Sequence, residues 1–264
     1  MATEAPSLPR RRSPGLPSGA RGLAGSALMI VLTFVVWEIV VRATGTPSYV
    51  LPAPSSILST ADWTLVLEAA RATALSVVAG FAVGNAAGLV LALLISASPV
   101  LAALLYPFAL TLRAIPIVAL APFITLAFGR GTASTVVVAA LIVFFPTLVN
   151  VLLGLRSVER EALELMHVLD CGPLTVYWRA RLPAAMPAFF DAMRIAAPAA
   201  VLGVMTAEWV IGGDGLGKLV ISSALALESE RMWAAILTST VLAGLVFALV
   251  TVAERRLLRW VTRS

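Results

Sequence analysis

The chain has 264 residues, of which 60% are hydrophobic and only 12% charged, a balance that no soluble domain of this size needs to build one core. The net charge of +5 would suit a nucleic-acid-binding protein, but the arginines stand at the ends of apolar segments and form no single face, which argues against that class. One cysteine, Cys171, and one histidine, His167, cannot form a disulfide within the chain or supply the ligands of a structural metal site.

The first residues differ in composition from the rest of the chain. Residues 1–22 combine arginine with proline, serine and glycine, which predicts a disordered basic tail because such a mixture buries little surface. The apolar run of residues 23–41 follows, with no small-residue cleavage site at its end. We therefore expect this run to be an uncleaved first transmembrane helix, and residues 23–264 to form one transmembrane domain.

Five further apolar segments approach or exceed the roughly 20 residues that a helix needs to cross a bilayer. They cover residues 72–96, 99–128, 132–155, 195–211 and 233–253. The sequence thus predicts an all-α integral membrane protein with about six transmembrane helices.

The second span carries Gly80, Gly84 and Gly88 at four-residue spacing, near one face of the helix. Small residues at this spacing let two helix backbones approach closely in lipid, although small residues are common in membrane helices in any case. We expect this face to pack against a neighbouring helix.

The third span is interrupted by Pro107, Arg113, Pro116 and Pro122. Proline removes a backbone donor, so a break at membrane depth is tolerated only where protein or a water-filled cavity covers the freed groups. This segment is therefore not expected to be one straight helix.

The distribution of Lys and Arg predicts the orientation. If both termini and the hydrophilic connection at residues 156–194 are cytoplasmic, thirteen basic residues lie inside and five outside, leaving out Arg113 within a span. Positive residues favour the cytoplasmic side. We therefore expect a multi-pass membrane protein with both termini in the cytoplasm.

One segment matches the opening of a phosphate-binding P-loop, with Gly212 followed by Gly217 and Lys218. The next residue, Leu219, lacks the hydroxyl that would hold magnesium, and the preceding segment is a membrane span. We therefore reject nucleotide binding and interpret the segment as a glycine-rich turn after the fifth span.

The 156–194 connection contains an amphipathic pattern. Val158, Ala162, Leu165 and Leu169 recur at three- and four-residue spacing, with acidic residues on the other side of the predicted helix. Such a helix could lie on the lipid surface or dock in a groove of a partner protein. Docking is favoured because the apolar face lacks a strong rim of Lys and Arg.

The amphipathic helix is expected to end at Gly172 and Pro173, and a second short helix is expected over residues 174–181. Pro183 and Pro187 are then expected to turn the chain back toward the fifth span.

Several short motifs occur in a characteristic order along the chain. They are Leu51-Pro52-Ala53-Pro54, Arg113-Ala114-Ile115-Pro116, Ala121-Pro122, Phe145-Pro146 with Asn150, Gly154-Leu155-Arg156-Ser157-Val158, Leu182-Pro183-Ala184-Ala185, Ala207-Glu208 with Gly215-Leu216-Gly217, and the basic end 254–260. In this order the chain resembles the inner-membrane permease family of binding-protein-dependent ABC importers, especially its sulfonate, nitrate and taurine branch. The resemblance covers nearly the whole chain after residue 45.

The signature of that family is a Glu-Ala-Ala triplet, a glycine after it and a Leu-Pro pair further on. Counting back from Pro183 places the triplet at Glu164-Leu165-Met166 and the glycine at Asp170, so only the glutamate matches. We expect Gly172 to provide the turn in place of the missing glycine.

The resemblance implies a type I ABC importer permease, whose loop docks in a groove on a cytoplasmic ABC ATPase dimer. The residues it assigns to this ATPase-coupling loop are Glu161, Ala162, Glu164, Leu165, Met166, His167, Leu169, Asp170, Gly172, Leu182 and Pro183. It further implies that the chain is not an enzyme and binds no cofactor, since ATP and magnesium belong to the ATPase. The other implied partners are a second permease subunit, expected to be a second copy, an extracytoplasmic solute-binding protein and membrane lipid.

Polar residues within the spans are candidates for the translocation path, because burying a charge there costs about 2.5 to 3.5 kcal/mol. Arg113 beside Pro116 would suit an anionic substrate, or would instead pair with a carboxylate or carbonyls that hold the broken helix. Glu208 is either a gate residue or a structural partner.

Three further polar residues lie in the spans. Glu38 is expected to reach the interface, and Asn85 and Asn150 more often bridge helices than contact substrate, although Asn150 is also a path candidate.

The expected function is import of a small solute: a sulfonate, nitrate, taurine or a related anionic or heteroaromatic compound. The main alternative is a secondary transporter or channel that works without ATP, which predicts inverted internal symmetry and more polar residues at the midplane. A membrane enzyme is less favoured, because no cluster of His, Asp and Glu is found at membrane depth.

Overall fold

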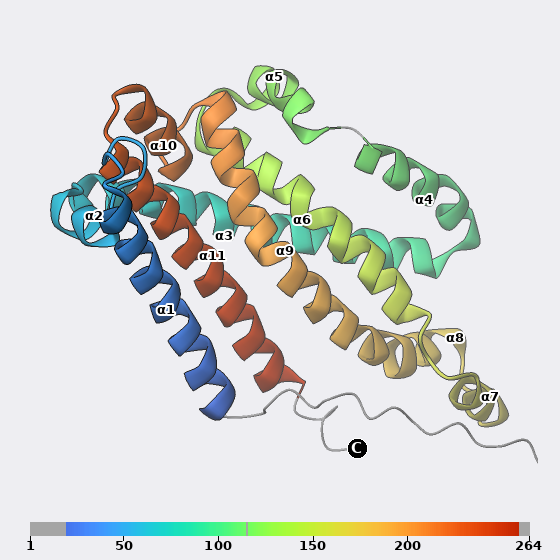
Figure 1. Cartoon of the computed structure of the whole chain (residues 1–264). Helices are drawn as coiled ribbons and strands as arrows, with labels where there is room; N and C mark the ends of the chain where they lie inside the picture. The colour runs from blue at the N-terminus through green and yellow to red at the C-terminus, as the bar shows by residue number, and fades with distance from the viewer. Residues whose placement is uncertain (1–19, 115, 259–264) are drawn as a thin grey trace, which may run out of the picture.

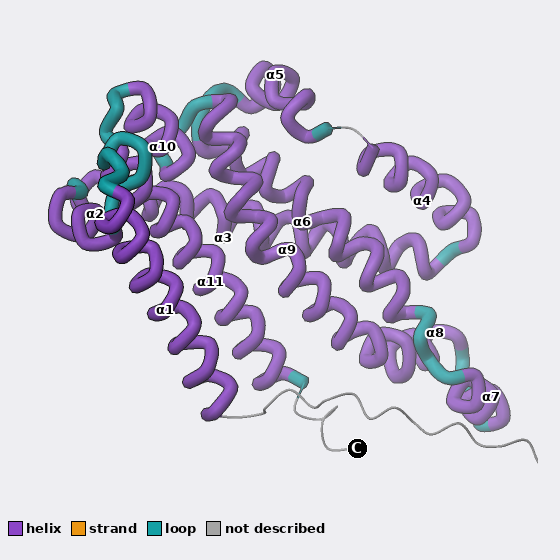
Figure 2. Tube along the Cα trace, viewed as in Figure 1, coloured by secondary structure: helices purple, strands orange, loops and turns teal. Residues whose placement is uncertain are grey.

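The computed structural model describes residues 20–114 and 116–258, and these residues form helices joined by short loops (Figure 2). The elements are α1 (Ala20–Thr44), α2 (Pro54–Thr60), α3 (Trp63–Ala97), α4 (Pro99–Ala114), α5 (Ile117–Phe128), α6 (Thr132–Leu155), α7 (Arg160–Val168), α8 (Pro173–Val176), the π-helical segment η1 (Tyr177–Arg181), α9 (Leu182–Ile211), α10 (Leu216–Leu225) and α11 (Ser229–Leu257). The predicted all-α membrane fold is confirmed.

Among the described residues, five helices are long and apolar enough to cross a bilayer, namely α1, α3, α6, α9 and α11. They coincide with the first, second, fourth, fifth and sixth predicted spans. The third predicted span is divided into α4 and α5, each shorter than a bilayer-crossing helix. As expected from its prolines, it is not one straight helix, and α5 begins directly after Pro116.

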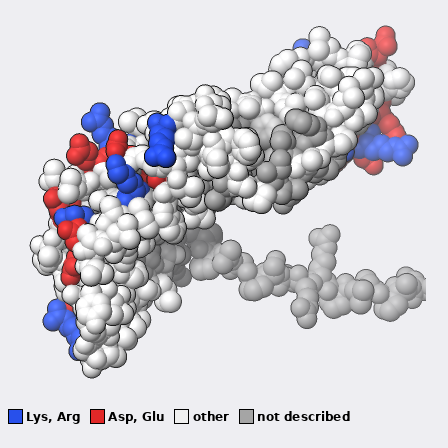
Figure 3. Space-filling view, turned by 90° about the horizontal axis from the view of Figure 1, so that it is seen from above, with Lys and Arg blue, Asp and Glu red and all other residues white. Residues whose placement is uncertain are grey.

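The long helices α1, α6, α9 and α11 run in roughly the same direction in Figure 1, and the short helices collect at the two ends of the bundle. The α10 end is formed by α2, α5 and α10, and the α7 end by α7 and α8. Charged side chains gather toward the two ends of the molecule in Figure 3, whereas the surface between them is almost free of charge on the face shown. This distribution fits an apolar band that lies in the bilayer.

The fifth span begins earlier than the sequence predicted. We expected Pro183 and Pro187 to turn the chain, but both lie within α9, which starts at Leu182 and follows η1 and α8 without a break. Pro183 stands in the first turn of α9, where a missing N–H is tolerated. Immediately before it, the Leu182 amide N–H donates to the Tyr177 carbonyl in the wider turn of η1.

The bundle is centred on α6, which packs against α3 on one side and α9 on the other. Gly80, Gly84 and Gly88 face α6, as predicted: a Cβ at Gly88 would lie 2.8 Å from the Phe144 carbonyl oxygen and 2.9 Å from Thr147 Cβ. Gly154 brings α6 equally close to Ala185 of α9. Helix backbones therefore touch at positions where any side chain would separate them.

Two hydrogen bonds add to the contact between α3 and α6. The Thr147 hydroxyl donates to Asn85 Oδ1 at 2.8 Å, and the Thr135 hydroxyl donates to Ser76 Oγ at 3.1 Å. All four residues are buried. The predicted bridging role of Asn85 is confirmed, and these bonds pin the rotation of one helix against the other.

Gly84→Ala should destabilise the protein. The new Cβ would lie 2.5 Å from the Ala140 carbonyl oxygen and 2.8 Å from Val143 Cβ, so two helices must move apart, at a cost of about 1 to 3 kcal/mol. Thermal unfolding of the detergent-solubilised protein should show a lower midpoint. Gly244→Ala in α11 is the matched control, because a Cβ there meets nothing within 4 Å, and its midpoint should be unchanged or higher. Equal midpoints for the two variants would contradict the packing described.

Candidate functional site

Helix α7 lies at one end of the bundle, away from the long helices, and none of its residues is buried. Of the predicted apolar face, Ala162, Leu165 and Leu169 are exposed, with Leu165 60% accessible, whereas Val158 lies before the start of α7 and is partly buried. Glu164 pairs with Arg160 along the same helix, with 2.8 Å between Oε1 and Nε. The described chain thus presents an apolar helix face that it does not itself cover.

The coupling-loop residues predicted from the sequence lie in four consecutive parts of the chain. Glu161, Ala162, Glu164, Leu165, Met166 and His167 are on α7, Leu169 and Asp170 form the turn after it, Gly172 precedes α8, and Leu182 and Pro183 begin α9.

The turn after α7 is made by Asp170, whose φ of +52° lies in the left-handed region. The Asp170 amide N–H donates to the His167 carbonyl, and the Cys171 amide N–H donates to the Met166 carbonyl, each at 3.0 Å. This pair of bonds is a Schellman motif, in which glycine is the usual residue at the left-handed position. The expectation that Gly172 provides the turn is wrong, because its φ is −62°.

The chain that follows α7 forms one long, continuous helical stretch that runs through the bundle. From α8 through η1 into α9 the chain stays helical up to Ile211, at the α10 end. Along the way Arg194 of α9 forms ion pairs with Asp191 of the same helix and with Glu254 of α11, at 3.0 Å for the latter. One helical unit therefore connects the exposed loop with the opposite end of the molecule.

At the α10 end, Glu208 of α9 is buried with 3% of its surface accessible. Its carboxylate accepts hydrogen bonds from the Thr73 hydroxyl at 2.9 and 3.0 Å and from the Gly217 amide N–H at 2.9 Å. The Thr73 oxygen in turn accepts from the Leu216 amide N–H at 2.8 Å. Side chains from α9 and α3 thus accept from two of the free N–H groups at the start of α10, those of Leu216 and Gly217.

This arrangement explains the glycines around α10. A Cβ at Gly215 would overlap the Glu208 carboxylate, and a Cβ at Gly217 would overlap the Met205 carbonyl oxygen. It also supports the rejection of a P-loop, because a carboxylate already occupies the position at the helix N-terminus where a phosphate would bind.

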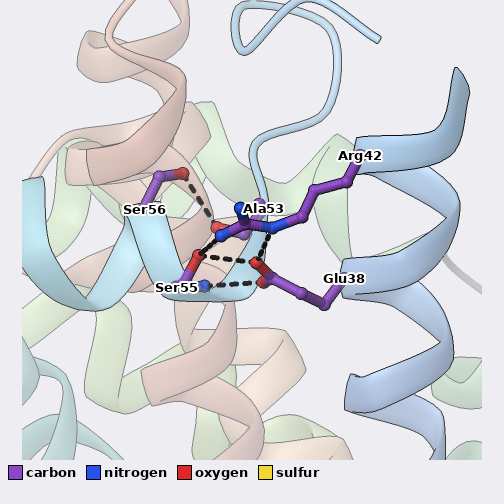
Figure 4. Close-up of polar contacts among 5 residues, drawn as sticks. All are labelled: Glu38, Arg42, Ala53, Ser55 and Ser56. Carbon is purple, nitrogen blue, oxygen red and sulfur yellow. Dashed lines mark hydrogen bonds and ion pairs between the residues drawn. The ribbon is translucent and has the colours of Figure 1, made fainter. Parts of the chain in front are cut away.

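Glu38 of α1 plays a comparable part for α2, which has no side-chain cap of its own (Figure 4). Its carboxylate accepts from the Ser55 amide N–H at 3.0 Å, from the Ser55 hydroxyl at 2.7 Å and from Arg42 Nε at 2.5 Å. We expected this side chain to reach the interface. The structure adds that it holds the start of α2 against α1.

The predicted path residues do not form one cluster. Pro116 is exposed at the start of α5, and the Asn150 amide donates to the Pro146 carbonyl of its own helix at 2.8 Å. Glu208 lies in the buried network at the α10 end. The side chain of Arg113 lies outside the described part of the structure.

Sequence reasoning missed a stripe on α9. Ile195, Leu202 and Trp209, spaced by seven residues, are all exposed along one face of the helix. Beside the stripe lies an apolar groove of about 270 Å³ between α5, α6 and α9, lined in part by Ile142 and Gly203. In a membrane span such a pattern cannot be told from a lipid-facing surface, so the sequence carried no usable signal for it.

The titratable residues offer little for metal chemistry. Among the residues that the structure describes, no group of three or more His, Cys, Asp or Glu side chains could hold a metal ion.

Comparison with known proteins gives one family. The model of the family described as "Binding-protein-dependent transport system inner membrane component" matches residues 84–259. A probable ABC transporter permease protein of Haemophilus influenzae is 34% identical over 212 residues, which cover 80% of this chain and 86% of the relative.

Two other relatives carry substrate names. The formylaminopyrimidine transport permease protein ThiX of Halalkalibacterium halodurans is 32% identical over 236 residues, covering 88% of this chain and 94% of the relative. The taurine transport system permease protein TauC of Escherichia coli is 28% identical over 185 residues, covering 70% and 64% respectively.

Asp170→Gly should stabilise the end of α7, because glycine adopts the left-handed conformation without the steric cost of about 1 kcal/mol that a Cβ brings. Hydrogen exchange of the α7 amides should become slower. Asp170→Val is the opposing variant: a β-branched residue is strained at this φ, so exchange should become faster. The turn would be misassigned if both variants exchanged like the parent chain.

Proposed function

Because the chain belongs to the family of binding-protein-dependent transport system inner membrane components, we propose that it couples solute import to a separate ATPase through residues 156–194. The chain is the membrane-spanning permease subunit of an ABC importer. ATP and magnesium are bound by the partner subunit, an ABC ATPase expected as a dimer.

The observation that carries the proposal is the exposed apolar face of α7. A helix with Leu165 and Leu169 open to its surroundings gains by inserting that face into a groove of another protein. The Schellman turn at Asp170 fixes where the chain leaves this helix, and α8, η1 and α9 follow. We propose that motion of the docked helix is passed along this helical unit into the membrane.

The orientation follows from this role. A helix that docks on an ATPase must face the cytoplasm, which agrees with the excess of Lys and Arg predicted on that side. We propose that both termini and the α7 end are cytoplasmic in the inner membrane.

We further propose that two copies of the chain enclose the path between their α9 stripes. Leu202 is 68% accessible and lies at the groove between α5, α6 and α9, which Gly203 also lines. A second copy that packs on this face would cover the exposed apolar surface of the stripe and the groove. Arg113, Pro116 and Asn150 remain proposed path residues. Glu208 is proposed to contribute by holding α10 on α9 at the mouth of that path.

The cargo is proposed to be a small anionic or heteroaromatic solute delivered by an extracytoplasmic solute-binding protein. The names of the relatives, a formylaminopyrimidine permease and a taurine permease, support this range. An ATP-independent transporter or channel would leave the exposed face of α7 without a partner, which makes this alternative weaker.

Glu164→Lys should abolish association with the ATPase. The ion pair that Glu164 loses is an exposed i,i+4 pair worth only about 0.3 to 0.5 kcal/mol, so the fold should persist. Co-purification of the ATPase with the tagged permease is the measurement. If α7 instead lies on the lipid surface, the Glu164→Lys variant should co-purify as much ATPase as the parent chain does.

The control for this variant is Glu68→Lys in α3, an exposed glutamate at the opposite end of the bundle. It makes the same change of charge and should co-purify the ATPase as the parent chain does. Loss of the ATPase from both variants would point to a general effect of charge and would contradict docking through α7.

Leu202→Cys should form a disulfide between two copies under mild oxidation, after the natural Cys171 has been changed to serine. Cysteines bridge only when their Cα atoms come within about 7 Å, so the crosslink reports a close pair of stripes. Leu245→Cys on α11, which is 56% accessible, is the control and should stay monomeric on a non-reducing gel. A crosslink at position 245 but not at 202 would place the second copy on another face.

A further inference from the structure

The α7 end carries a groove of about 780 Å³ between the last turns of α3 and the segment formed by α8 and η1. Val90 and Leu94 form its wall on α3, and Leu174, Trp178 and Arg181 form the opposite wall. Four of these five side chains are exposed and apolar, so the groove offers a hydrophobic surface with one cation at its edge.

The two walls are held together by Tyr177. Its hydroxyl lies 2.8 Å from Ser96 Oγ and donates to the Leu93 carbonyl at 3.2 Å, which ties η1 to the end of α3. The groove is therefore a preformed feature of the fold and not a gap between two independent segments.

The guanidinium of Arg181 lines the groove and is only partly exposed. It forms no hydrogen bond or ion pair with any residue in the described part of the chain, as is also true of the exposed Arg179, but of these two only Arg181 lines the apolar groove. Its five N–H donors in a rigid fork are therefore free to bind an anion that enters the groove from outside the chain.

The position of the groove indicates what that anion is. Its α3 wall belongs to a helix that is long and apolar enough to cross the bilayer, and the groove lies at the C-terminal end of that helix, which would place it toward one membrane surface. Tryptophan is typical of the membrane surface, and an arginine between helices at this level can bind the headgroup phosphate of an acidic lipid.

We propose that this groove binds an anionic phospholipid, with its phosphate on Arg181 and an acyl chain along Val90 and Leu94 against Trp178. The inference requires only that α3 crosses the bilayer. It does not depend on the proposed ATPase, the second copy or the orientation of the chain.

The test is native mass spectrometry of the full chain released from detergent that contains equal amounts of phosphatidylglycerol and phosphatidylcholine. The parent chain should retain phosphatidylglycerol in preference, and Arg181→Gln should lower its retention about tenfold, because a charge-assisted hydrogen bond is lost. Arg179→Gln is the matched control: it removes an exposed cation two residues away that does not line the groove, and retention should stay within twofold.

Three results of the retention measurement would overturn the proposal. They are equal retention of the two lipids by the parent chain, unchanged retention in Arg181→Gln, and equal losses in the two arginine variants. A groove covered by a second copy would give the first result. Competition by soluble glycerol phosphate as effective as by phosphatidylglycerol would show that only a free anion is bound, which also overturns a lipid site.

A second measurement does not rely on the arginine variants. Phosphatidylglycerol brominated on its acyl chain should quench tryptophan fluorescence more than brominated phosphatidylcholine does, and Trp178→Phe should remove this difference. Quenching that is the same with and without Trp178 would place the bound lipid elsewhere.

Discussion

The close contact of α3 with α6 is the constraint on which the rest of the bundle depends. In lipid the hydrophobic effect does not drive helices together, so they are held by packing and by interhelical hydrogen bonds. Gly80, Gly84 and Gly88 let the two backbones meet, and the bond between Thr147 and Asn85 fixes their rotation. Because α6 also packs closely on α9, the helices α3, α6 and α9 form one central packed unit, and the peripheral helices pack around it.

The acidic residues within the spans solve a problem of local structure. The short helices α2 and α10 lack side-chain caps of their own, and unsatisfied N–H groups are costly where water is scarce. Glu38 and Glu208 supply the missing acceptors from neighbouring long helices. The same bonds anchor α2 on α1 and α10 on α9, so each of these carboxylates, the partly exposed Glu38 and the buried Glu208, joins separate elements of the fold.

The two ends of the molecule differ in what they leave open. The α10 end holds the buried network around Glu208, whereas the α7 end exposes the apolar face of α7 and the groove beside Trp178. In our proposals these two surfaces meet an ATPase and an acidic lipid. Both surfaces adjoin the helical unit of α8, η1 and α9: α7 directly precedes it in the chain, and Trp178 is part of it. The same unit carries the exposed stripe around Leu202. A partner bound at one end is thus linked by helix to the surface proposed for the path.

The sequence by itself determined the membrane class, the position of most spans, the break near Pro116, the packing face of the three glycines and the amphipathic character of α7. These features depend on local composition and spacing. Only the tertiary structure decided that α9 starts at Leu182, that Asp170 makes the turn, that Glu208 caps α10 and that Arg181 has no partner among the described residues. Such features arise from φ angles and from contacts between residues distant in sequence, such as Thr73 and Glu208, which spacing along one chain cannot encode.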